Sequence, residues 1–248
     1  MGRRYKGQLL HGWLNLDKPP GLSSSQTVSR VRRAFDARKA GHGGTLDPLA
    51  TGILPIAFGE ATKTVTYAMD GIKAYQFGVR WGEARSTDDR EGNIIETHYH
   101  RPTALQIEDT MAAFVGTIEQ VPPRFSAVKV GGRRAYDLAR RNKAVELKPR
   151  RVEVQELRLV DVPDADSAVL SVTCGKGTYV RALARDLAHR LGTVGYVDWL
   201  RRTMVGPFIE ADAISLDKIE TLGHIPPDSS LLMPIETVLD DIPALALS

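Results

Sequence analysis

The chain has 248 residues, of which 42% are hydrophobic and 25% are charged, and its formal net charge is +3. This composition excludes a mostly disordered or collagen-like chain, and the length fits one large domain or one domain with a small appendage. The single cysteine, Cys174, excludes an internal disulfide and a cysteine-based metal cluster, and without a long apolar run or a signal core we expect a soluble, cytoplasmic protein with no membrane contact.

The first half of the chain predicts short elements separated by glycine and proline. A strand over 9–19 ends in a Pro-Pro-Gly turn, and three serines at 23–25 then offer N-caps for a short helix. A glycine-rich loop covers 41–52. The remaining predicted elements are a helix over 59–69, a strand over 74–81, a strand over 94–98 that we expect to pair with it, and a helix over 104–115.

The second half mixes strands and helices without regular alternation. Its clearest element is an amphipathic helix over 179–191. The irregular order favours an α+β fold over a doubly wound sheet. The other predicted elements are a short strand over 127–130, a helix over 133–141, paired strands over 152–162 and 168–174 around a turn at 163–164, a strand over 194–204 and a helix over 215–222.

The net charge conceals an uneven distribution. Residues 204–248 carry a net charge of −7, which leaves +10 on residues 1–203, and the segment 124–151 alone carries +8. Such clusters suggest a face that binds a polyanion such as nucleic acid, whereas an arginine-rich solvated surface explains the same pattern about equally well. A second basic cluster consists of Arg30, Arg32, Arg33, Arg38 and Lys39.

The most informative segment is GHGGTLDPLATGILPIAFGEATK, over 41–63. It matches neither the Walker nor the dinucleotide-binding pattern. Its glycines permit a close backbone approach to a ligand, and Asp47 is held between a leucine and a proline. One alternative is that Asp47 caps a helix that has Pro48 at its first position. His42 is best interpreted as a polar contact of the loop, because no histidine pair has zinc-site spacing.

This segment resembles the signature of the TruB family of tRNA pseudouridine synthases. The resemblance covers most of residues 10–210. Other matching motifs follow in the same order, namely LNLDKPPGLSSSQ (14–26), KAYQFGVRWG (73–82), PPRFSAVKVGGRRAYDLAR (122–140), CGKGTYVRALARDL (174–187) and VDWLRRTMVGPF (197–208). The small departure is Gly175, where the family commonly has serine.

The resemblance implies a pseudouridine synthase fold, with a mixed, largely antiparallel central sheet flanked by helices and loops. It also implies the activity: the uridine at position 55, in the T-arm loop of tRNA, flips out, its glycosidic bond breaks, and the uracil rejoins the ribose through C5. This isomerisation needs neither a cofactor nor a metal ion, and the sequence has no motif for either. Asp47 matches the family's essential carboxylate, which attacks C1′ or C6 or assists cleavage at the sugar.

Further site residues follow from the same resemblance. Arg181 matches the arginine that supports the catalytic carboxylate, since a fixed cation keeps a buried carboxylate ionised; without the resemblance it reads as a solvated helix arginine. Tyr75 matches the tyrosine that stacks on the target base, and alone it reads as a half-buried strand tyrosine. Tyr179 and Leu200 match further nucleotide contacts, with Leu200 otherwise plain core. His42 matches the residue that stabilises the opened T-loop, and Lys18 and Pro19 are expected to support the active-site loop.

The resemblance also predicts the organisation of the chain. We expect a catalytic domain over 1–210, an acidic segment over 211–248, and no PUA-type domain after it. An RNA-clamping insertion is expected at about 124–151, and the protein is expected to bind the tRNA T-arm stem-loop as a monomer. The residues predicted to contact phosphates are Arg133, Arg134, Arg140, Arg141 and Lys143.

Two other functions are consistent with parts of the pattern. One is a non-catalytic RNA-binding or RNA-folding protein on the same scaffold, for which loss of Asp47 would be typical. The other is a glycoside or nucleoside hydrolase, which normally needs a second working carboxylate, and the matched motifs show no obvious partner. The presence of Asp47 favours the isomerase.

Overall fold

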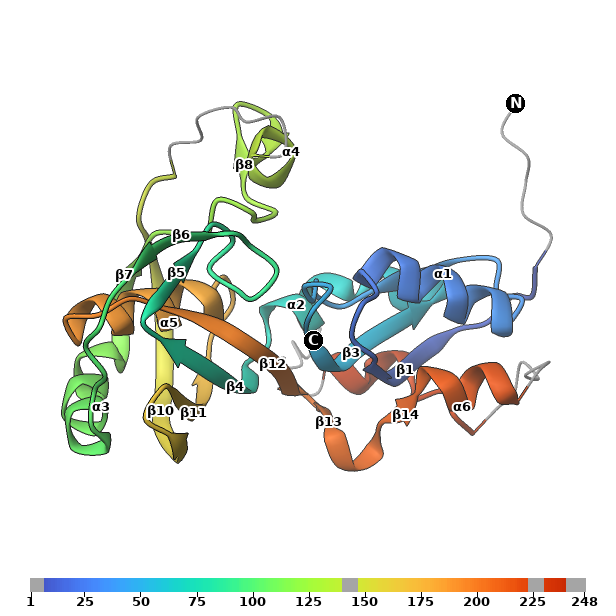
Figure 1. Cartoon of the computed structure of the whole chain (residues 1–248). Coiled ribbons are helices and arrows are strands. Elements are labelled where there is room, and N and C mark those ends of the chain that lie inside the picture. The colour runs from blue at the N-terminus through green and yellow to red at the C-terminus, as the bar shows by residue number, and fades with distance from the viewer. Residues whose placement is uncertain (1–6, 140–146, 223–229, 240–248) are drawn as a thin grey trace, which may run out of the picture. The chain divides into compact units, whose positions relative to one another are not determined.

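The structure is a computed structural model that describes residues 7–139, 147–222 and 230–239 (Figure 1). The chain divides into two compact units, the first formed by residues 1–73 and 201–248 and the second by residues 74–200. Each unit has strands of a mixed, mostly antiparallel sheet with helices beside them, as the α+β prediction requires. The strand β12 (Gly195–Val205) runs from the second unit into the first.

The first unit is built on the strand order β14-β1-β3-β12. The long pair β1 and β3 is antiparallel, from Gly12 opposite Phe58 to Lys18 opposite Gly52, and β3 pairs in parallel with β12. The elements of this unit are β1 (Gly12–Lys18), α1 (Ser24–Ala34), β2 (Ala40–His42), β3 (Thr51–Phe58), η1 (Gly59–Lys63), α2 (Val65–Asp70), β13 (Phe208–Ile209), η3 (Glu210–Asp212), β14 (Ile214–Ser215), α6 (Leu216–Thr221) and η4 (Ile235–Val238).

The core of the first unit lies around Trp13 on β1. Its ring packs against Phe208 with ring centroids 5.4 Å apart, and Ile53, Ala57 and Ala68 are buried in the same cluster. Helix α1 begins where the serines predict. Ser23 is the N-cap and accepts a hydrogen bond from the amide of Gln26, which completes a capping box.

The second unit has the strand order β12-β4-β11-β10-β7. The long strands β10 and β11 form an antiparallel hairpin and are drawn side by side in Figure 1. Its elements are β4 (Lys73–Trp81), β5 (Glu83–Arg85), β6 (Ile94–Thr97), α3 (Ala104–Met111), η2 (Ala112–Phe114), β7 (Gly116–Gln120), β8 (Lys129–Val130), β9 (Arg133–Arg134), α4 (Ala135–Ala139), β10 (Arg150–Asp164), β11 (Ser167–Cys174), α5 (Val180–Arg190) and the first part of β12.

Three predicted details of the second unit are wrong. Strand β6 pairs with β5 and not with β4, because Gly82 has φ +91° and turns the chain away after Trp81. The hairpin of β10 and β11 turns at 165–166, two residues later than predicted. Pro163 has no amide hydrogen to donate, and it lies within β10 where the register with β11 shifts, so no interstrand hydrogen bond is needed from it. Residues 133–134 form a strand instead of the first turn of a helix.

Candidate active site

Asp47 lies in the loop that joins β2 to β3. No helix follows it: its carbonyl accepts a hydrogen bond from the amide of Ala50 at 3.1 Å in a turn, and β3 starts at Thr51. The alternative that Asp47 caps a helix is therefore wrong. Asp47 is half-buried in this turn, so its side chain is neither a helix cap nor fully enclosed.

The backbone on both sides of Asp47 is bound by groups from β1 and α1. The hydroxyl of Ser24 donates to the carbonyl of Leu46 at 3.0 Å and accepts from its amide at 2.8 Å. On the other side, the carbonyl of Pro48 accepts from the amide of Gly21 at 2.8 Å and from Nζ of Lys18 at 3.4 Å. Nζ of Lys18 also donates to the carbonyls of Pro19 at 2.7 Å and Leu22 at 2.8 Å, so it links the turn after β1 to the loop that contains Asp47.

A buried arginine holds the first part of the same loop. Arg202 on β12 is only 1% exposed, and its guanidinium donates to the carbonyls of Ile53 at 2.7 Å, Gly44 at 3.1 Å and Thr45 at 3.4 Å. A planar fork of donors suits this task, because one rigid group reaches three acceptors at once. Together with Ser24 and Lys18, Arg202 fixes the backbone of residues 44–48, and so the position of Asp47.

Two glycines explain why the loop is glycine-rich. A Cβ at Gly43 would lie 2.9 Å from Cβ of Ala68 and 3.3 Å from the ring of Trp13, so a side chain would clash with the core. Gly44 has φ +123°, which L side chains rarely adopt. His42, the last residue of β2, is half-buried opposite Ile56 on β3. The two glycines therefore allow the backbone between His42 and Asp47 to pack directly against the core.

Tyr179 and Arg181 lie at the start of α5, in the second unit. Arg181 is only 3% exposed, and its guanidinium donates to the carbonyls of Thr87 at 2.8 Å and Phe125 at 2.9 Å. The interpretation of Arg181 as a solvated helix arginine is wrong. Tyr179 is the N-cap of α5 and is half-buried. One helix turn thus holds two of the predicted site residues.

Arg181 also faces a buried carboxylate. Oδ2 of Asp89 lies 3.4 Å from Nη1 of Arg181, and the side chains of both residues are 4% exposed. Oδ1 of Asp89 accepts hydrogen bonds from the hydroxyl of Thr87 at 2.6 Å and from the amide of Glu91 at 3.1 Å. Because Asp89 is itself held by these donors, it fixes the direction in which the guanidinium of Arg181 points.

The neighbouring carboxylate has a different environment. Asp88 pairs with Arg185 on α5 at 2.9 Å. Burial raises the pKa of Asp88 above its usual value of 3.8, although the charges of Arg185 and Arg181 oppose this shift. Asp88 has φ +60°, an uncommon backbone conformation for a non-glycine residue.

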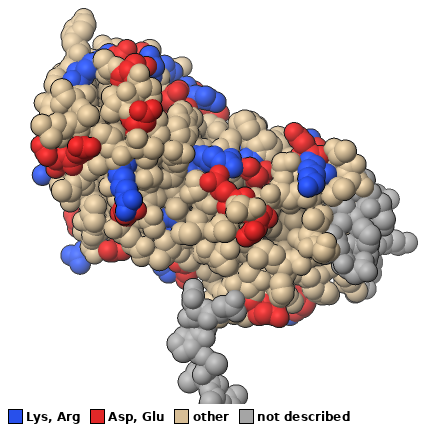
Figure 2. Space-filling model, turned by 90° about the horizontal axis from the view of Figure 1, so that it is seen from below, with Lys and Arg blue, Asp and Glu red and all other residues tan. Residues whose placement is uncertain are grey.

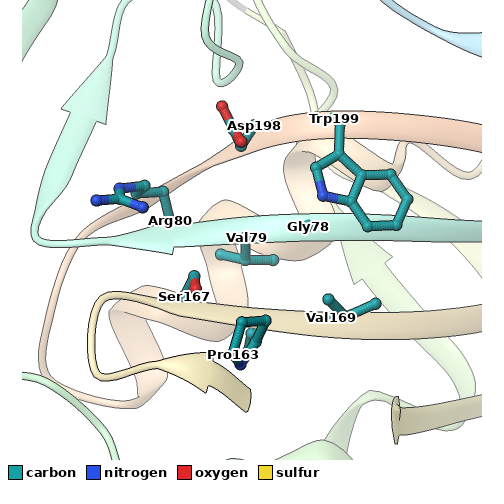
Figure 3. Close-up of a pocket in the computed structure, with 9 residues that line it drawn as sticks. Gly78, Val79, Arg80, Pro163, Ser167, Val169, Asp198 and Trp199 are labelled. Atoms are coloured by element: carbon teal, nitrogen blue, oxygen red, sulfur yellow. The ribbon is translucent and has the colours of Figure 1, made fainter. Parts of the chain in front are cut away.

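The other two predicted nucleotide contacts lie on strands of the second unit. Tyr75 is half-buried on β4, which fits both a stacking residue and an ordinary strand tyrosine, and Leu200 on β12 is buried. Its neighbour Trp199 lines a pocket of about 100 Å³ with Gly78, Arg80, Pro163, Ser167, Val169 and other residues (Figure 3). The pocket contains none of the predicted site residues.

The predicted phosphate contacts are only partly described. Arg133 and Arg134 form β9, which pairs with β8, whereas Arg140, Arg141 and Lys143 lie outside the described residues. On the face in Figure 2, the basic and acidic side chains are interspersed and not separated into fields of one sign. This face therefore gives no continuous basic surface of the kind that the charge count suggested.

Within residues 7–139, 147–222 and 230–239, no cluster of three or more His, Cys, Asp or Glu side chains is arranged to hold a metal ion. Among the same residues, no helix is long and apolar enough to cross a membrane.

The sequence did not identify three residues that support predicted site residues, each within its own unit. Ser24 was only one of three candidate caps, and Arg202 lies in a matched motif without an assigned role. Asp89 lies in a polar stretch between predicted strands. Each of the three is a buried polar or charged side chain bonded to the surroundings of a predicted site residue. Composition and spacing do not show this burial.

Two models of known families match the chain. The model described as the TruB family pseudouridylate synthase N-terminal domain matches residues 32–180, and the tRNA pseudouridylate synthase B C-terminal domain matches residues 181–240. Proteins called tRNA pseudouridine synthase B are similar over the whole chain. Those of Rhodospirillum rubrum and Caulobacter vibrioides are each 57% identical over 248 residues, covering 100% of this chain and 80% of the relative, and that of Gluconacetobacter diazotrophicus is 58% identical, covering 99% and 81%.

Solved structures show the same fold at lower identity. The chain is similar to one in a crystal structure of a Cbf5–Nop10–Gar1 complex, with a TM-score of 0.71 and 26% identity, covering 93% of this chain and 62% of that one. A second match, in an archaeal box H/ACA sRNP Nop10–Cbf5 complex, has a TM-score of 0.70 and 25% identity, with the same coverage. The chain thus spans less than two thirds of these structural neighbours.

Proposed function

The chain belongs to the TruB family of pseudouridine synthases, enzymes that isomerise uridine in tRNA to pseudouridine, and we propose that Asp47 supplies the carboxylate for this reaction on the T-arm loop. The observation that carries the proposal is the support of the Asp47 loop. Buried donors from β1, α1 and β12 bind its backbone at residues 44, 45, 46 and 48. A catalytic group held in this way loses little conformational freedom when the substrate binds.

The reaction requires only what such a carboxylate offers. The bond between N1 of uracil and C1′ breaks, the base turns, and a bond forms between C5 and C1′; the hydrogen on C5 leaves to solvent as a proton and N1 takes up a proton from solvent. No electrons are gained or lost overall. Asp47 acts as a nucleophile at C1′ or at C6, or removes a proton from the sugar; each route needs an ionised carboxylate.

The residues of the second unit have roles that suit their surroundings. By the family resemblance, Arg181 is the cation that supports the catalytic carboxylate, and its bonds to the carbonyls of Thr87 and Phe125 hold its guanidinium in one orientation. Tyr75 stacks on the flipped uracil, and Tyr179 and Leu200 contact the same nucleotide. In the first unit, His42 stabilises the opened T-loop.

The RNA is held largely through its phosphates. The insertion at about 124–151, with its net charge of +8, supplies the arginines and the lysine predicted to bind them. The position isomerised is uridine 55 of the T-arm. The enzyme acts as a monomer in the cytoplasm on tRNA stem-loops, with 1–210 as its catalytic domain and 211–248 as the acidic remainder.

The test measures tritium release from C5 of uridine in a T-arm transcript. We expect release with the wild type and essentially none with Asp47→Asn. The matched control is Asp36→Asn, an exposed aspartate with φ 43° that asparagine tolerates, and it should release tritium at the wild-type rate. Wild-type release from Asp47→Asn would overturn the assignment. RNA binding without release by the wild type would indicate a non-catalytic RNA-folding protein, and free uracil would indicate a hydrolase.

A further inference from the structure

A buried glutamine holds the backbone of Tyr179. Gln120, the last residue of β7, is 2% exposed and lies 59 residues from Tyr179 in the sequence. Its Oε1 accepts from the amide of Tyr179 at 2.8 Å, and its Nε2 donates to the carbonyl of the same residue at 3.1 Å. The side-chain amide thus uses both its polar groups on one residue, as a neighbouring β-strand would.

This arrangement fixes the start of α5. Tyr179 is the N-cap, and its own side chain makes no capping bond. Its carbonyl also accepts the first bond of the helix, from the amide of Leu183 at 3.0 Å. Only one orientation of the glutamine amide satisfies both bonds. In the flipped orientation, Nε2 would face the amide of Tyr179, which is also a donor, and Oε1 would face its carbonyl, which is also an acceptor. The position of the first helical turn therefore depends on Gln120.

The segment that follows Gln120 binds the same helix. The carbonyl of Phe125 accepts from Arg181, and the carbonyl of Val121 accepts from Arg185 at 2.8 Å. These two bonds end on long side chains, which can adjust to a moved helix. The bonds of Gln120 act instead on the backbone of α5 itself, at its N-cap residue, so they bear directly on where the helix begins.

We propose that Gln120 is a positioning residue for pseudouridine formation: its amide fixes the backbone of Tyr179 and, through the first turn of α5, the position of Arg181. The proposal rests on the roles proposed above for Tyr179 and Arg181. It assigns to Gln120 an effect on the rate of the reaction and not on the affinity for tRNA, because the glutamine is 2% exposed and presents almost no surface for contact with RNA.

The decisive variant is Gln120→Glu, which has nearly the same shape. Its ionised carboxylate still accepts from the amide of Tyr179 but places a negative oxygen against the carbonyl. Protonation restores a donor toward that carbonyl. We expect the single-turnover rate at saturating tRNA to be roughly tenfold or more below the wild-type rate at pH 8, and the ratio of the two rates to recover as the pH falls toward 5.5. The dissociation constant for tRNA should stay within about twofold.

Two further variants complete the experiment. Gln120→Met cannot form either bond at any pH, so its rate should be low and its ratio to the wild type should not change with pH. Gln106→Glu is the control: Gln106 is an exposed capping residue of α3 whose Oε1 accepts from the amide of Thr103 at 2.8 Å, and glutamate keeps that bond. All rates are measured well below the melting temperature of each variant, so that a folding defect does not enter.

The outcomes separate the two proposals. Wild-type rates for folded Gln120→Glu and Gln120→Met would overturn the role of Gln120. A loss of rate in Gln120→Glu that does not change with pH would also overturn it, because the rate would then not depend on whether the glutamate can donate to the carbonyl of Tyr179. Asp47→Asn is measured in the same assay. If that variant keeps the wild-type rate, the proposed function fails, whatever the glutamine variants do.

Discussion

The hydroxyl of Ser24 is bonded to both polar backbone groups of Leu46, at 3.0 and 2.8 Å. All three atoms are buried, so water cannot replace the hydroxyl when it is removed. The residue next to Leu46 is Asp47. A single side chain on α1 thus determines the backbone position of the residue before the proposed catalytic carboxylate.

Replacing this serine should affect both stability and rate. We expect Ser24→Ala to lower the free energy of unfolding by about 1–3 kcal/mol, because a donor and an acceptor lose their partner. The single-turnover rate should fall about tenfold. Denaturant unfolding and tritium release measure the two effects. Ser29→Ala is the control, since the exposed hydroxyl of Ser29 bonds only to the carbonyl of Ser25 within α1; an equal loss there would contradict the prediction.

Arg202→Lys should be strongly unfavourable although the charge is kept. Lysine is a point donor and cannot reach the carbonyls of Ile53, Gly44 and Thr45 together. We expect a loss of about 2–3 kcal/mol in the free energy of unfolding and a lower rate at saturating tRNA. Arg33→Lys, on the exposed side of α1, should change neither quantity. Equal stability of the two variants would refute the role of the guanidinium fork.

Gly43→Ala tests the packing of the loop against the core. The added methyl group would meet Ala68 and the ring of Trp13, so the loop must move. We expect a loss of about 1–3 kcal/mol, typical of an overpacked site, together with reduced tritium release. Gly175→Ala is the matched control, because a Cβ there has only ordinary contacts with Glu153. A fully active Gly43→Ala would show that the tight approach is not needed.

Asp88 predicts a specific dependence of stability on pH. Its pKa is raised in the folded state by burial, so the folded chain holds this proton more tightly than the unfolded chain. The stabilisation that this causes is complete below the unfolded pKa of about 4 and is lost as the pH rises through the folded pKa. Asp88→Asn removes the titration. The free energy of unfolding of the wild type minus that of the variant should therefore decrease from pH 4 to pH 7 in denaturant titrations, and an increase would contradict the shift.

The basic insertion predicts a change in salt dependence. Replacing Arg133 and Arg134 by alanine should weaken tRNA binding and reduce the slope of log K against log salt concentration by about 1.4–1.8, if each contacts one phosphate. Arg158→Ala is the control, because this exposed arginine on β10 is paired with Glu156 outside the insertion. Unchanged affinity of the double variant at low salt would contradict the prediction that these two arginines contact phosphates.

Local patterns were sufficient to predict most elements of the fold. The period of apolar residues in α5 and the alternation in β10 and β11 are properties of neighbouring residues, and the structure confirms both. The pairing of β6 was predicted wrongly, since Gly82 and a bond from its amide to the carbonyl of Val194 redirect the chain. This bond joins residues far apart in the sequence, so no window of sequence contains it.

The same distinction holds for the site. The motifs located Asp47 and Arg181, but the burial of Arg181 depends on carbonyls of Thr87 and Phe125 that a helical pattern does not reveal. Among the serines, the sequence did not decide which one caps α1. In the structure Ser23 is the cap, and Ser24, one residue further round the helix, faces Leu46.

The groups that support the Asp47 loop bind mainly its backbone carbonyls. A residue supplies such a carbonyl whatever its side chain is. Side-chain identity at exposed Thr45 is therefore weakly constrained, whereas the donors Lys18, Ser24 and Arg202 are strongly constrained. In a library randomised at these positions and selected for activity, Thr45 should accept many replacements and the three donors few. The tolerance to mutation around the proposed catalytic carboxylate would then be lowest at positions far from it in the sequence.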